Sequence, residues 1–445
     1  MTDTEDAAAV NQPPVIDGLA PDQSTGPASG PPSDRAGEPG IDPRLDSSRA
    51  WMVALAAFTA NTVGFSTVYG FGTFFQEMAD EFDSGLGATA AVFSVTTFVY
   101  LSLGLVTGPL ADRFGPRPLV AVGGAIMSVS LLATSRVDSV VAGYVTYGLG
   151  VGVGIGCFLV PLLASVGGWF VRRRAFATGL ALSGIGLGTL VFVPLIDRLI
   201  REVGWRQAYV VLAVITAISL AFVTAATARP PTSAPRVRAT VRELMGSADF
   251  VRLYIGETLM STALFVPFVF LVKYAEDRGV GPTAASLLIG VLGASSVIGR
   301  IGLGALTHRF GAVRVLLWSF ALQPIGYLLW LVAGGSYPLL VVFAALVGIG
   351  YGGFIALSPE IAAQRYGAER LGSVLGLLYT GGGIGGLIGP IAAGVLIDAA
   401  DGGFSVPIIA AVVLTSLSLV AMWPLDRAAV TAPILEPVET GRIRS

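Results

Sequence analysis

The chain has 445 residues, of which 53% are hydrophobic and only 13% charged, and its mean hydropathy is +0.75. Soluble domains carry about 25% charged residues, so this composition excludes an ordinary soluble protein and predicts an integral membrane protein. With a net charge of −2 and no basic cluster among aromatic residues, we expect no nucleic acid partner. The single cysteine and the single histidine, Cys157 and His308, exclude a disulfide framework and most zinc sites, so we expect no metal and no cofactor.

Residues 1–48 are rich in Pro, Gly, Ser and Asp and lack hydrophobic periodicity, which predicts a disordered tail. This tail has neither the basic start nor the apolar stretch of a signal peptide. Twelve apolar segments follow, each about 20 residues or longer, and as helices they can cross a hydrocarbon core of roughly 30 Å. The predicted spans are 51–75, 88–110, 117–135, 140–166, 175–196, 206–228, 252–272, 283–306, 312–333, 337–359, 371–397 and 404–424.

Basic residues predict the orientation of these spans, because cytoplasmic loops are enriched in arginine and lysine. If the N-terminus is cytoplasmic, the inner loops contain Arg113, the triplet 172–174 and the arginines of the loop 229–250. The outer side then holds only Arg136, Arg198, Arg201, Arg206, Lys273 and Arg278. We therefore expect a multi-pass protein of the cell (inner) membrane with both termini in the cytoplasm.

Two motifs recur on either side of the long basic loop. GPLADRFGPR (108–117) ends the second span, and GALTHRFGAVR (304–314) ends the eighth, 196 residues later. GLALSGIGLG (179–188) in the fifth span recurs as GLLYTGGGIGG (376–386) in the eleventh, at an offset of 197. Two matches at almost one offset predict a duplicated six-helix unit. The expected divisions are a cytoplasmic tail 1–48, a bundle 49–228, an interdomain loop 229–250, a bundle 251–425 and a cytoplasmic tail 426–445.

These motifs resemble those of a known family. GPLADRFGPR resembles the loop signature of the major facilitator superfamily, and WFVRRRAFATGLALSG (169–184) closely resembles the loop-and-fifth-helix signature of the monocarboxylate transporters. VPFVFLVKYAEDRG (266–279) and the eleventh-span glycine run are similar to that family and to bacterial oxalate/formate antiporters. The family's first-helix signature is reduced here to DSSRAW (46–51). The resemblance covers residues 46–424 and implies an all-α integral membrane protein, with twelve transmembrane helices in two six-helix pseudo-repeats around a central cavity.

Asp112 and Arg113 lie where the second span meets the cytoplasm. A carboxylate there gains from the dipole of a neighbouring helix start, so the pair predicts a conformational latch that forms in one arrangement and breaks in another. The alternative is a tight, positively charged turn. The arginines 172–174 are either a topology signal or a gate element, and the glycines of the fifth and eleventh spans serve either close packing or hinges.

Arg300 is the only charged residue in the run GASSVIGRIGLGAL (293–306). A guanidinium in the bilayer costs roughly 3 kcal/mol on insertion scales, so it needs a partner. Gly293, Ser296 and Gly304 share its helical face and leave space beside it. The carboxylate of a substrate and an internal acid both remain open as partners. In the monocarboxylate transporters an aspartate lies one turn before this arginine, where Ser296 stands here.

Glu257 is the only acid within the seventh span and is therefore the candidate internal partner of Arg300. A carboxyl group in a membrane can exchange a proton when its surroundings change, so Glu257 is equally the candidate for proton coupling.

Four further residues are expected to shape the pocket, although packing is the alternative role for each tyrosine. Asn61 and Tyr69 lie on one face of the first span. Tyr351 on the tenth span matches an aromatic position of the family, and Tyr379 opens the glycine run of the eleventh. The oxalate-type relatives carry a lysine three residues after that tyrosine, where Gly382 stands here. A single positive charge favours a monoanion over a dianion.

We therefore expect a secondary active transporter that moves a small organic monocarboxylate by alternating access, together with a proton. No Walker A sequence is present, which argues against ATP-driven transport. The expected partners are a small organic anion, a proton and the lipid bilayer, and the protein should work as a monomer. The alternative is an exporter of drugs or other organic solutes, in which Glu257 would pair with Arg300. One His and one Cys argue against an enzyme, and the short polar tails argue against a receptor with a signalling domain.

Overall fold

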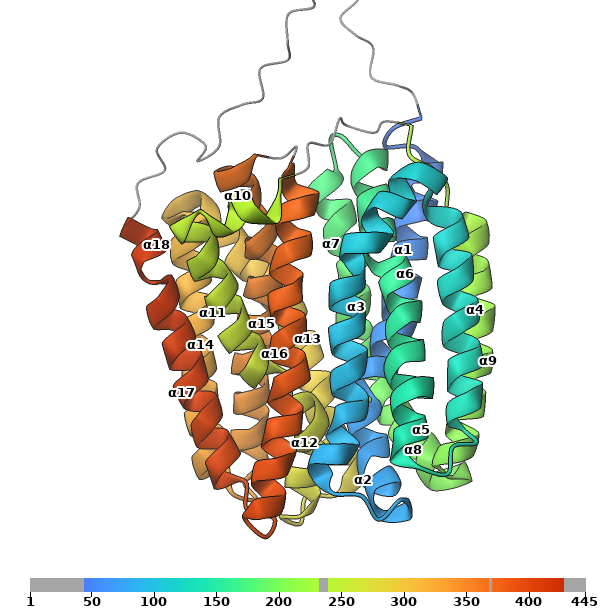
Figure 1. Cartoon of the computed structure of the whole chain (residues 1–445), viewed down its shortest axis with the longest axis vertical. Coiled ribbons are helices and arrows are strands. Elements are labelled where there is room, and N and C mark those ends of the chain that lie inside the picture. Colours follow the sequence, from blue (N-terminus) through green and yellow to red (C-terminus); the bar gives the residue numbers. More distant parts are fainter. Residues whose placement is uncertain (1–43, 232–238, 368–369, 428–445) are drawn as a thin grey trace, which may run out of the picture. The chain divides into compact units, whose positions relative to one another are not determined.

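The computed structural model describes residues 44–231, 239–367 and 370–427, and every regular element in these ranges is a helix. The predicted tails 1–48 and 426–445 therefore lie almost wholly outside the described residues. The described helices belong to one compact unit (Figure 1).

Within the described residues, twelve helices are long and apolar enough to cross a membrane, which confirms the predicted fold class. The first six spans are α1 (Ser48–Tyr69) with α2 (Phe71–Glu81); α3 (Leu86–Phe114); α4 (Pro116–Thr134); α5 (Val140–Gly143), the π-helix η1 (Tyr144–Val151) and α6 (Gly152–Trp169); α7 (Arg174–Leu187), the π-helix η2 (Gly188–Phe192) and α8 (Val193–Val203); and α9 (Trp205–Ala226). The second six are α11 (Ala248–Leu264) with α12 (Val266–Glu276), α13 (Pro282–Phe310), α14 (Ala312–Ala333), α15 (Tyr337–Tyr366), α16 (Leu371–Ala399) and α17 (Ser405–Met422), followed by α18 (Pro424–Arg427).

The predicted interdomain loop 229–250 contains a short helix, α10 (Val241–Met245), and the start of α11. Thr240 and Glu243 form a capping box, in which each side chain accepts a hydrogen bond from the backbone N–H of the other residue. The backbone N–H of Thr240 is the main cause that lowers the pKa of the Glu243 carboxyl below its ordinary value. This local cap explains why a helix forms in a segment that hydrophobic periodicity alone assigns to a loop.

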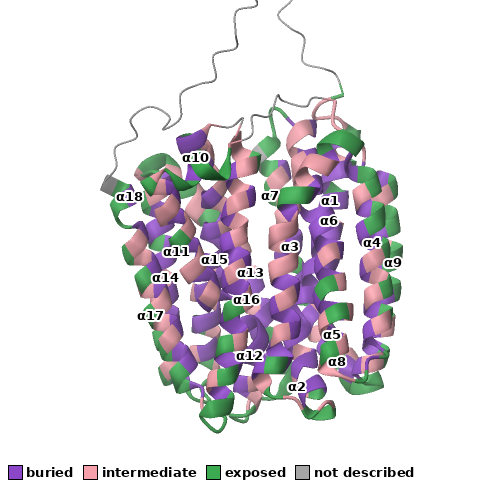
Figure 2. Cartoon of the chain, in the orientation of Figure 1, coloured by how far each residue is buried: buried purple, intermediate pink, exposed green. Residues whose placement is uncertain are grey.

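α1 begins, and α18 lies, at the end of the molecule that carries the arginine-rich loops, called here the basic end; the other end is called the opposite end (Figure 1). Large apolar side chains such as Ile218, Val332 and Val420 remain 67–69% exposed. Figure 2 shows buried residues concentrated where helices face one another, with exposed residues along the outer surfaces. This distribution is that of a bundle whose outer faces contact lipid.

The first spans of the two halves are broken at corresponding positions, near Gly70 and near Phe265. Pro267 has no N–H to offer the carbonyl of Ala263 four residues earlier, and the hydroxyl of Tyr327 donates to that carbonyl instead, at 2.8 Å. In the first half the hydroxyl of Tyr147 donates to the carbonyl of Thr67, 196 residues before Ala263, at 2.7 Å. Each break is thus stabilised by a tyrosine hydroxyl, which makes both bends fixed features of the fold.

The glycines of the fifth and eleventh spans pack against the first and seventh spans. A Cβ at Gly188 would lie 2.6 Å from the carbonyl oxygen of Thr62, and a Cβ at Gly385 would lie 2.6 Å from that of Thr258. No side chain larger than hydrogen fits at either position without movement. The close-packing interpretation therefore applies to both glycines, and the two contacts follow the internal repeat.

The distance between the two halves changes along α7 and α13. A Cβ at Gly186 would lie 2.9 Å from the carbonyl oxygen of Gly293, so the helices nearly touch there. Gly179 lies two turns nearer the basic end on the same face of α7, yet a Cβ there would meet no described neighbour within 4 Å. The two helices therefore diverge toward the basic end.

Candidate functional site

Arg300 lies at the point where α7 and α13 begin to separate. Its side chain is 9% exposed, and its Nη1 donates to the carbonyl oxygen of Leu182 on α7 at 2.5 Å, which links the two halves. Its Nε and Nη2 are buried and have no hydrogen-bond partner in the described part of the chain. A buried donor without an acceptor costs about 1–3 kcal/mol, and more for a charged group. The bond to Leu182 thus offsets part of the free-energy cost of burying this cation, and the two unpaired donors leave the rest of that cost uncompensated.

The two free donor groups form one edge of the guanidinium. Nη2 lies trans to Cδ, so its N–H on that side runs parallel to the N–H of Nε. This pair of parallel donors matches the two oxygens of a carboxylate. Arg300 therefore presents two parallel donors on one edge, while its remaining nitrogen donates to the protein backbone.

The three predicted tyrosines all interact with this arginine. Tyr351, Tyr69 and Tyr379 all interact electrostatically with the guanidinium. The hydroxyls of Tyr69 and Tyr351 are 2.7 Å apart and share a hydrogen bond between the two halves. The ring of Tyr69 also stacks on Phe268, with ring centroids 4.0 Å apart. These contacts close the site on the side of the opposite end, because Phe268 belongs to the stabilised bend of the seventh span.

Asn61 is held in a packing contact. Its Nδ2 donates to the carbonyl oxygen of Ala181 at 2.9 Å and the residue is 1% exposed. The next carbonyl of α7, that of Leu182, accepts the bond from Arg300. Asn61 therefore secures the segment of α7 that presents an acceptor to the arginine, and its predicted contact with substrate remains a prediction.

Glu257 is fully buried on α11 and does not pair with Arg300. Its Oε1 accepts a hydrogen bond from the hydroxyl of Ser358 on α15 at 2.7 Å, and its Oε2 has no partner among the described residues. Tyr379 interacts electrostatically with both Glu257 and Arg300. The internal ion pair that the exporter alternative requires is absent from the described residues in this conformation.

Two contacts of the site, those made by Leu182 and Ser358, could hardly be predicted from the sequence. The acceptor at Leu182 is a backbone carbonyl, which every residue possesses. Ser358 is a small hydroxyl residue in an apolar span, and its position beside Pro359 within α15 is the only local feature that distinguishes it.

The predicted latch residues lie in the last turn of α3, at the basic end. The carbonyl oxygen of Asp112 accepts a hydrogen bond from Arg229 at 2.8 Å. The guanidinium of Arg113 lies over the ring of Phe114, 5.1 Å from its centroid. These contacts are compatible with both the latch and the tight turn, so the latch remains a prediction.

Asp46, from the reduced first-helix motif, holds the basic loop before α7. Its carboxylate accepts hydrogen bonds of 3.2–3.4 Å from the backbone N–H groups of residues 171–173. Partial desolvation acts to raise the pKa of this carboxyl, but the N–H of Arg172 and its two neighbours lower it below its ordinary value. Trp51 packs edge-on against Phe170 in the same loop. The first-helix motif (46–51) and the basic loop before α7, which are far apart in the sequence, are thus in contact in the fold.

The chain was compared with known families and structures. The Major Facilitator Superfamily profile matches residues 53–252 and 253–440. Monocarboxylate transporter 13 of Rattus norvegicus is 30% identical over 362 residues, which cover 79% of this chain and 83% of the relative. Monocarboxylate transporter 11 of Homo sapiens is 30% identical over 374 residues, with coverages of 79% and 78%.

Among solved structures, a bacterial homolog of the human lysosomal transporter Spinster, in an inward-facing and unoccupied conformation, matches with a TM-score of 0.67. It is 14% identical and the match covers 87% of this chain and 98% of that one, which supports the same fold.

Proposed function

Since the chain belongs to the Major Facilitator Superfamily, and within it to the monocarboxylate transporter-like proteins, we propose that it moves a small organic monocarboxylate by alternating access, coupled to a proton. The protein is a multi-pass membrane transporter and not an enzyme. The substrate, the coupling ion and the mechanism are our proposal.

The free edge of Arg300 is the observation that supports a carboxylate most strongly. Two parallel donors of a buried cation lack partners in the described structure, and a carboxylate would supply both acceptors and the opposite charge. Tyr69, Tyr351 and Tyr379 interact electrostatically with this guanidinium, and their hydroxyls are the groups proposed to contact the other polar atoms of the substrate. Arg300 is the single cation proposed to bind the substrate, and a monoanion would neutralise it without excess charge.

Glu257 is the proposed proton carrier. The carboxyl group is fully buried, its Oε2 has no partner within the described ranges, and Tyr379 interacts electrostatically with both this group and Arg300. A proton on Oε2 would make this buried group neutral, and its release would leave a charge that only a conformational change or water could stabilise. Binding of the substrate anion at Arg300 and of the proton at Glu257 would then neutralise both buried charges together.

The arginine-rich loops support a cytoplasmic position for the basic end, in the cell (inner) membrane, and hence cytoplasmic termini. The divergence of α7 and α13 toward that end, from Gly186 to Gly179, then corresponds to an inward-facing state. Asp112 and Arg113 lie at the open end, where a latch would form when the halves close. All the proposed substrate and proton residues belong to one chain, so the proposed working unit is a monomer.

Uptake into proteoliposomes tests this function. The panel is labelled lactate, pyruvate, acetate, formate and oxalate, each with and without an inward proton gradient, and lactamide is the matched neutral control. We expect accumulation of at least one monocarboxylate, stimulated by the gradient, and no uptake of lactamide. Transport of neutral or cationic organic solutes without any carboxylate would contradict the proposal and favour the exporter.

A further inference from the structure

The tripeptide Leu-Ile-Asp occurs at residues 195–197 and again at 396–398, near the end of the fifth and of the eleventh span. Both aspartates lie at the opposite end, and each forms a hydrogen bond with a residue of the other half of the protein. None of the proposed substrate, proton or latch residues takes part in these contacts.

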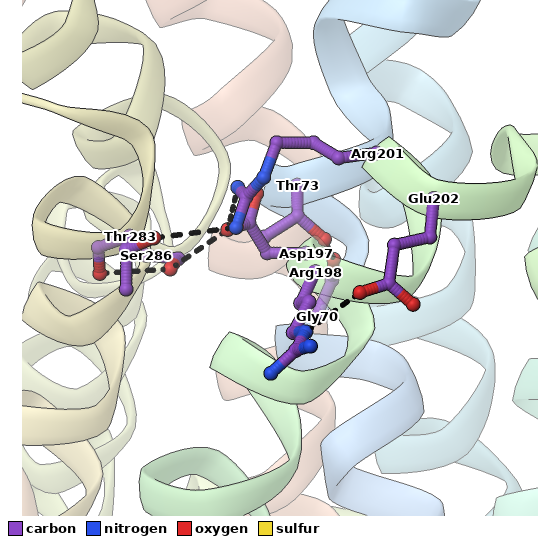
Figure 3. A network of polar contacts seen from close by, with 8 residues as sticks. All are labelled: Gly70, Thr73, Asp197, Arg198, Arg201, Glu202, Thr283 and Ser286. Carbon is purple, nitrogen blue, oxygen red and sulfur yellow. Dashed lines mark hydrogen bonds and ion pairs between the residues drawn. The ribbon is translucent and has the colours of Figure 1, made fainter.

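Asp197 on α8 contacts the first turns of α13 (Figure 3). Its Oδ2 accepts a hydrogen bond from the hydroxyl of Ser286 at 3.2 Å and forms an ion pair with Arg201 on its own helix. Arg201 in turn donates to the hydroxyl of Thr283 at 3.2 Å. Asp197 is only 7% exposed, so water competes little for these bonds. The fifth span is thus fastened to the eighth by two adjacent side chains.

Asp398 on α16 makes the corresponding contact with α3. Its Oδ2 accepts a hydrogen bond from the backbone N–H of Gly87 at 3.2 Å. Gly87 lies in the first turn of α3, where N–H groups have no partner within the helix, and the preceding cap residue Gly85 has no side chain to offer. A carboxylate from the other half therefore supplies the missing cap and gains from the helix dipole.

Open space borders each contact. A groove of about 610 Å³ is lined by residues of η2 and α8, among them Arg201, and by Thr283 of α13. Another of about 430 Å³ is lined by residues of α2, by the turn before α3 and by Asp398. Close helix packing accompanies both contacts: a Cβ at Gly394 would lie 2.6 Å from the Cα of Gly87, and a Cβ at Gly290 would lie 3.2 Å from the Cα of Leu190. The two aspartates thus add polar bonds to helix surfaces that already touch.

We propose that Asp197 and Asp398 form a paired lock that holds the opposite end closed, and that both contacts break when this end opens. This inference rests on the alternating access proposed above. The fifth and second spans correspond to the eleventh and eighth in the internal repeat, so the two contacts join corresponding pairs of spans. Asp197 and Asp398 are 201 residues apart, whereas the repeat has an offset of 196–197, so the two contacts lie at different positions along those spans. A rotation that separates the halves at this end must break both contacts, because each joins a helix of one half to a helix of the other.

The distance between the halves at the opposite end measures the lock directly. Spin labels are placed by Asp138→Cys, in the connection between α4 and α5, and by Ser336→Cys, before α15, in a Cys157→Ala background; both labelled positions are exposed. Pulsed electron paramagnetic resonance then gives the populations of short and long distances in detergent or nanodiscs, without substrate.

Asp197→Asn and Asp398→Asn should each raise the ratio of long to short distances. We expect about tenfold for the buried Asp197 and a few-fold for the exposed Asp398, with the double variant near the product of the two. Ser286→Ala removes the contact from the α13 side and leaves the Asp197–Arg201 pair intact, so it should reproduce the direction of the shift even if Asp197→Asn folds poorly.

Two matched controls remove a carboxylate charge at the same end. Glu202 pairs with Arg198 on its own helix (Figure 3), and Asp401 lies three residues beyond Asp398, so Glu202→Gln and Asp401→Asn should leave the ratio unchanged. Distances in the double variant that match the wild type, or controls that shift equally, would overturn the lock. Wild-type distances that do not respond to any carboxylate would count against the proposed function, while the lock is judged only on the variants without substrate.

Discussion

Replacement of Arg300 by lysine separates the charge of this residue from its geometry. Lysine keeps the positive charge, but its three N–H groups diverge from one nitrogen and cannot offer two parallel donors. In the wild type one nitrogen is already bonded to the carbonyl of Leu182, and the free pair, Nε and Nη2, remains for the substrate. The variant therefore tests the use of that edge.

The expected magnitude follows from this count of donors. Arg300→Lys retains the Coulomb attraction and loses the parallel second bond, which for charge-assisted hydrogen bonds is worth roughly 1–3 kcal/mol. The dissociation constant of the carboxylate should then rise about 5- to 150-fold. Arg300→Gln also removes the charge and should lose carboxylate binding almost entirely.

Isothermal titration calorimetry of the purified protein with the best carboxylate of the uptake panel measures this loss. Arg309→Lys is the matched control, since Arg309 lies on the same helix, is exposed and packs over the ring of Phe310. It should leave the dissociation constant unchanged. A dissociation constant for Arg300→Lys within twofold of the wild type, in a folded protein, would refute bidentate binding at this edge.

Three further predictions concern coupling, the latch and the basic loop. Glu257→Gln removes the proposed proton site, so accumulation driven by a pH gradient should be lost while exchange of substrate continues; full accumulation would remove Glu257 from the mechanism. If the carboxylate of Asp112 forms the proposed latch, Asp112→Asn removes its charge-assisted contact and should change the labelling of single cysteines at the two ends; unchanged labelling with normal transport would leave only the turn interpretation. The folded-state pKa of Asp46 is lowered, so its stabilising effect is present above its ordinary value of 3.8 and is lost as the pH falls through the folded value. The excess thermal stability of the wild type over Asp46→Asn should therefore be constant near neutral pH and disappear in acid, and a difference that grows in acid would contradict this origin.

The sequence predicted the features that depend on regular patterns. Span length and the isolation of Arg300 in an apolar run follow from the bilayer as solvent, and the offset of 196 follows from the internal duplication. The partner of Glu257 could not be identified from the sequence, because the order of helices along the chain does not determine which helices pack together. Ser358 lies on α15, three spans away along the chain. Leu182 acts through its backbone, which no side-chain pattern reveals.

The lock at the opposite end could have been noticed but not interpreted. Leu-Ile-Asp is repeated in the sequence, yet an aspartate near the end of a span normally faces water. Only the crossing of the helices brings Asp197 to Ser286 and Asp398 to the N–H of Gly87. Contacts between the halves depend on tertiary arrangement, and a single sequence contains no direct signal for them.

Carboxylate binding to purified Arg300→Gln and to the double variant Arg300→Gln/Glu257→Gln tests the central claim most directly. If the substrate carboxylate is the partner of Arg300, both proteins should fail to bind it, and the second substitution should restore nothing. If Arg300 instead serves to neutralise Glu257 in another conformation, the single variant should lose stability and the double variant should recover it. Recovery of wild-type carboxylate affinity in the double variant would contradict the account.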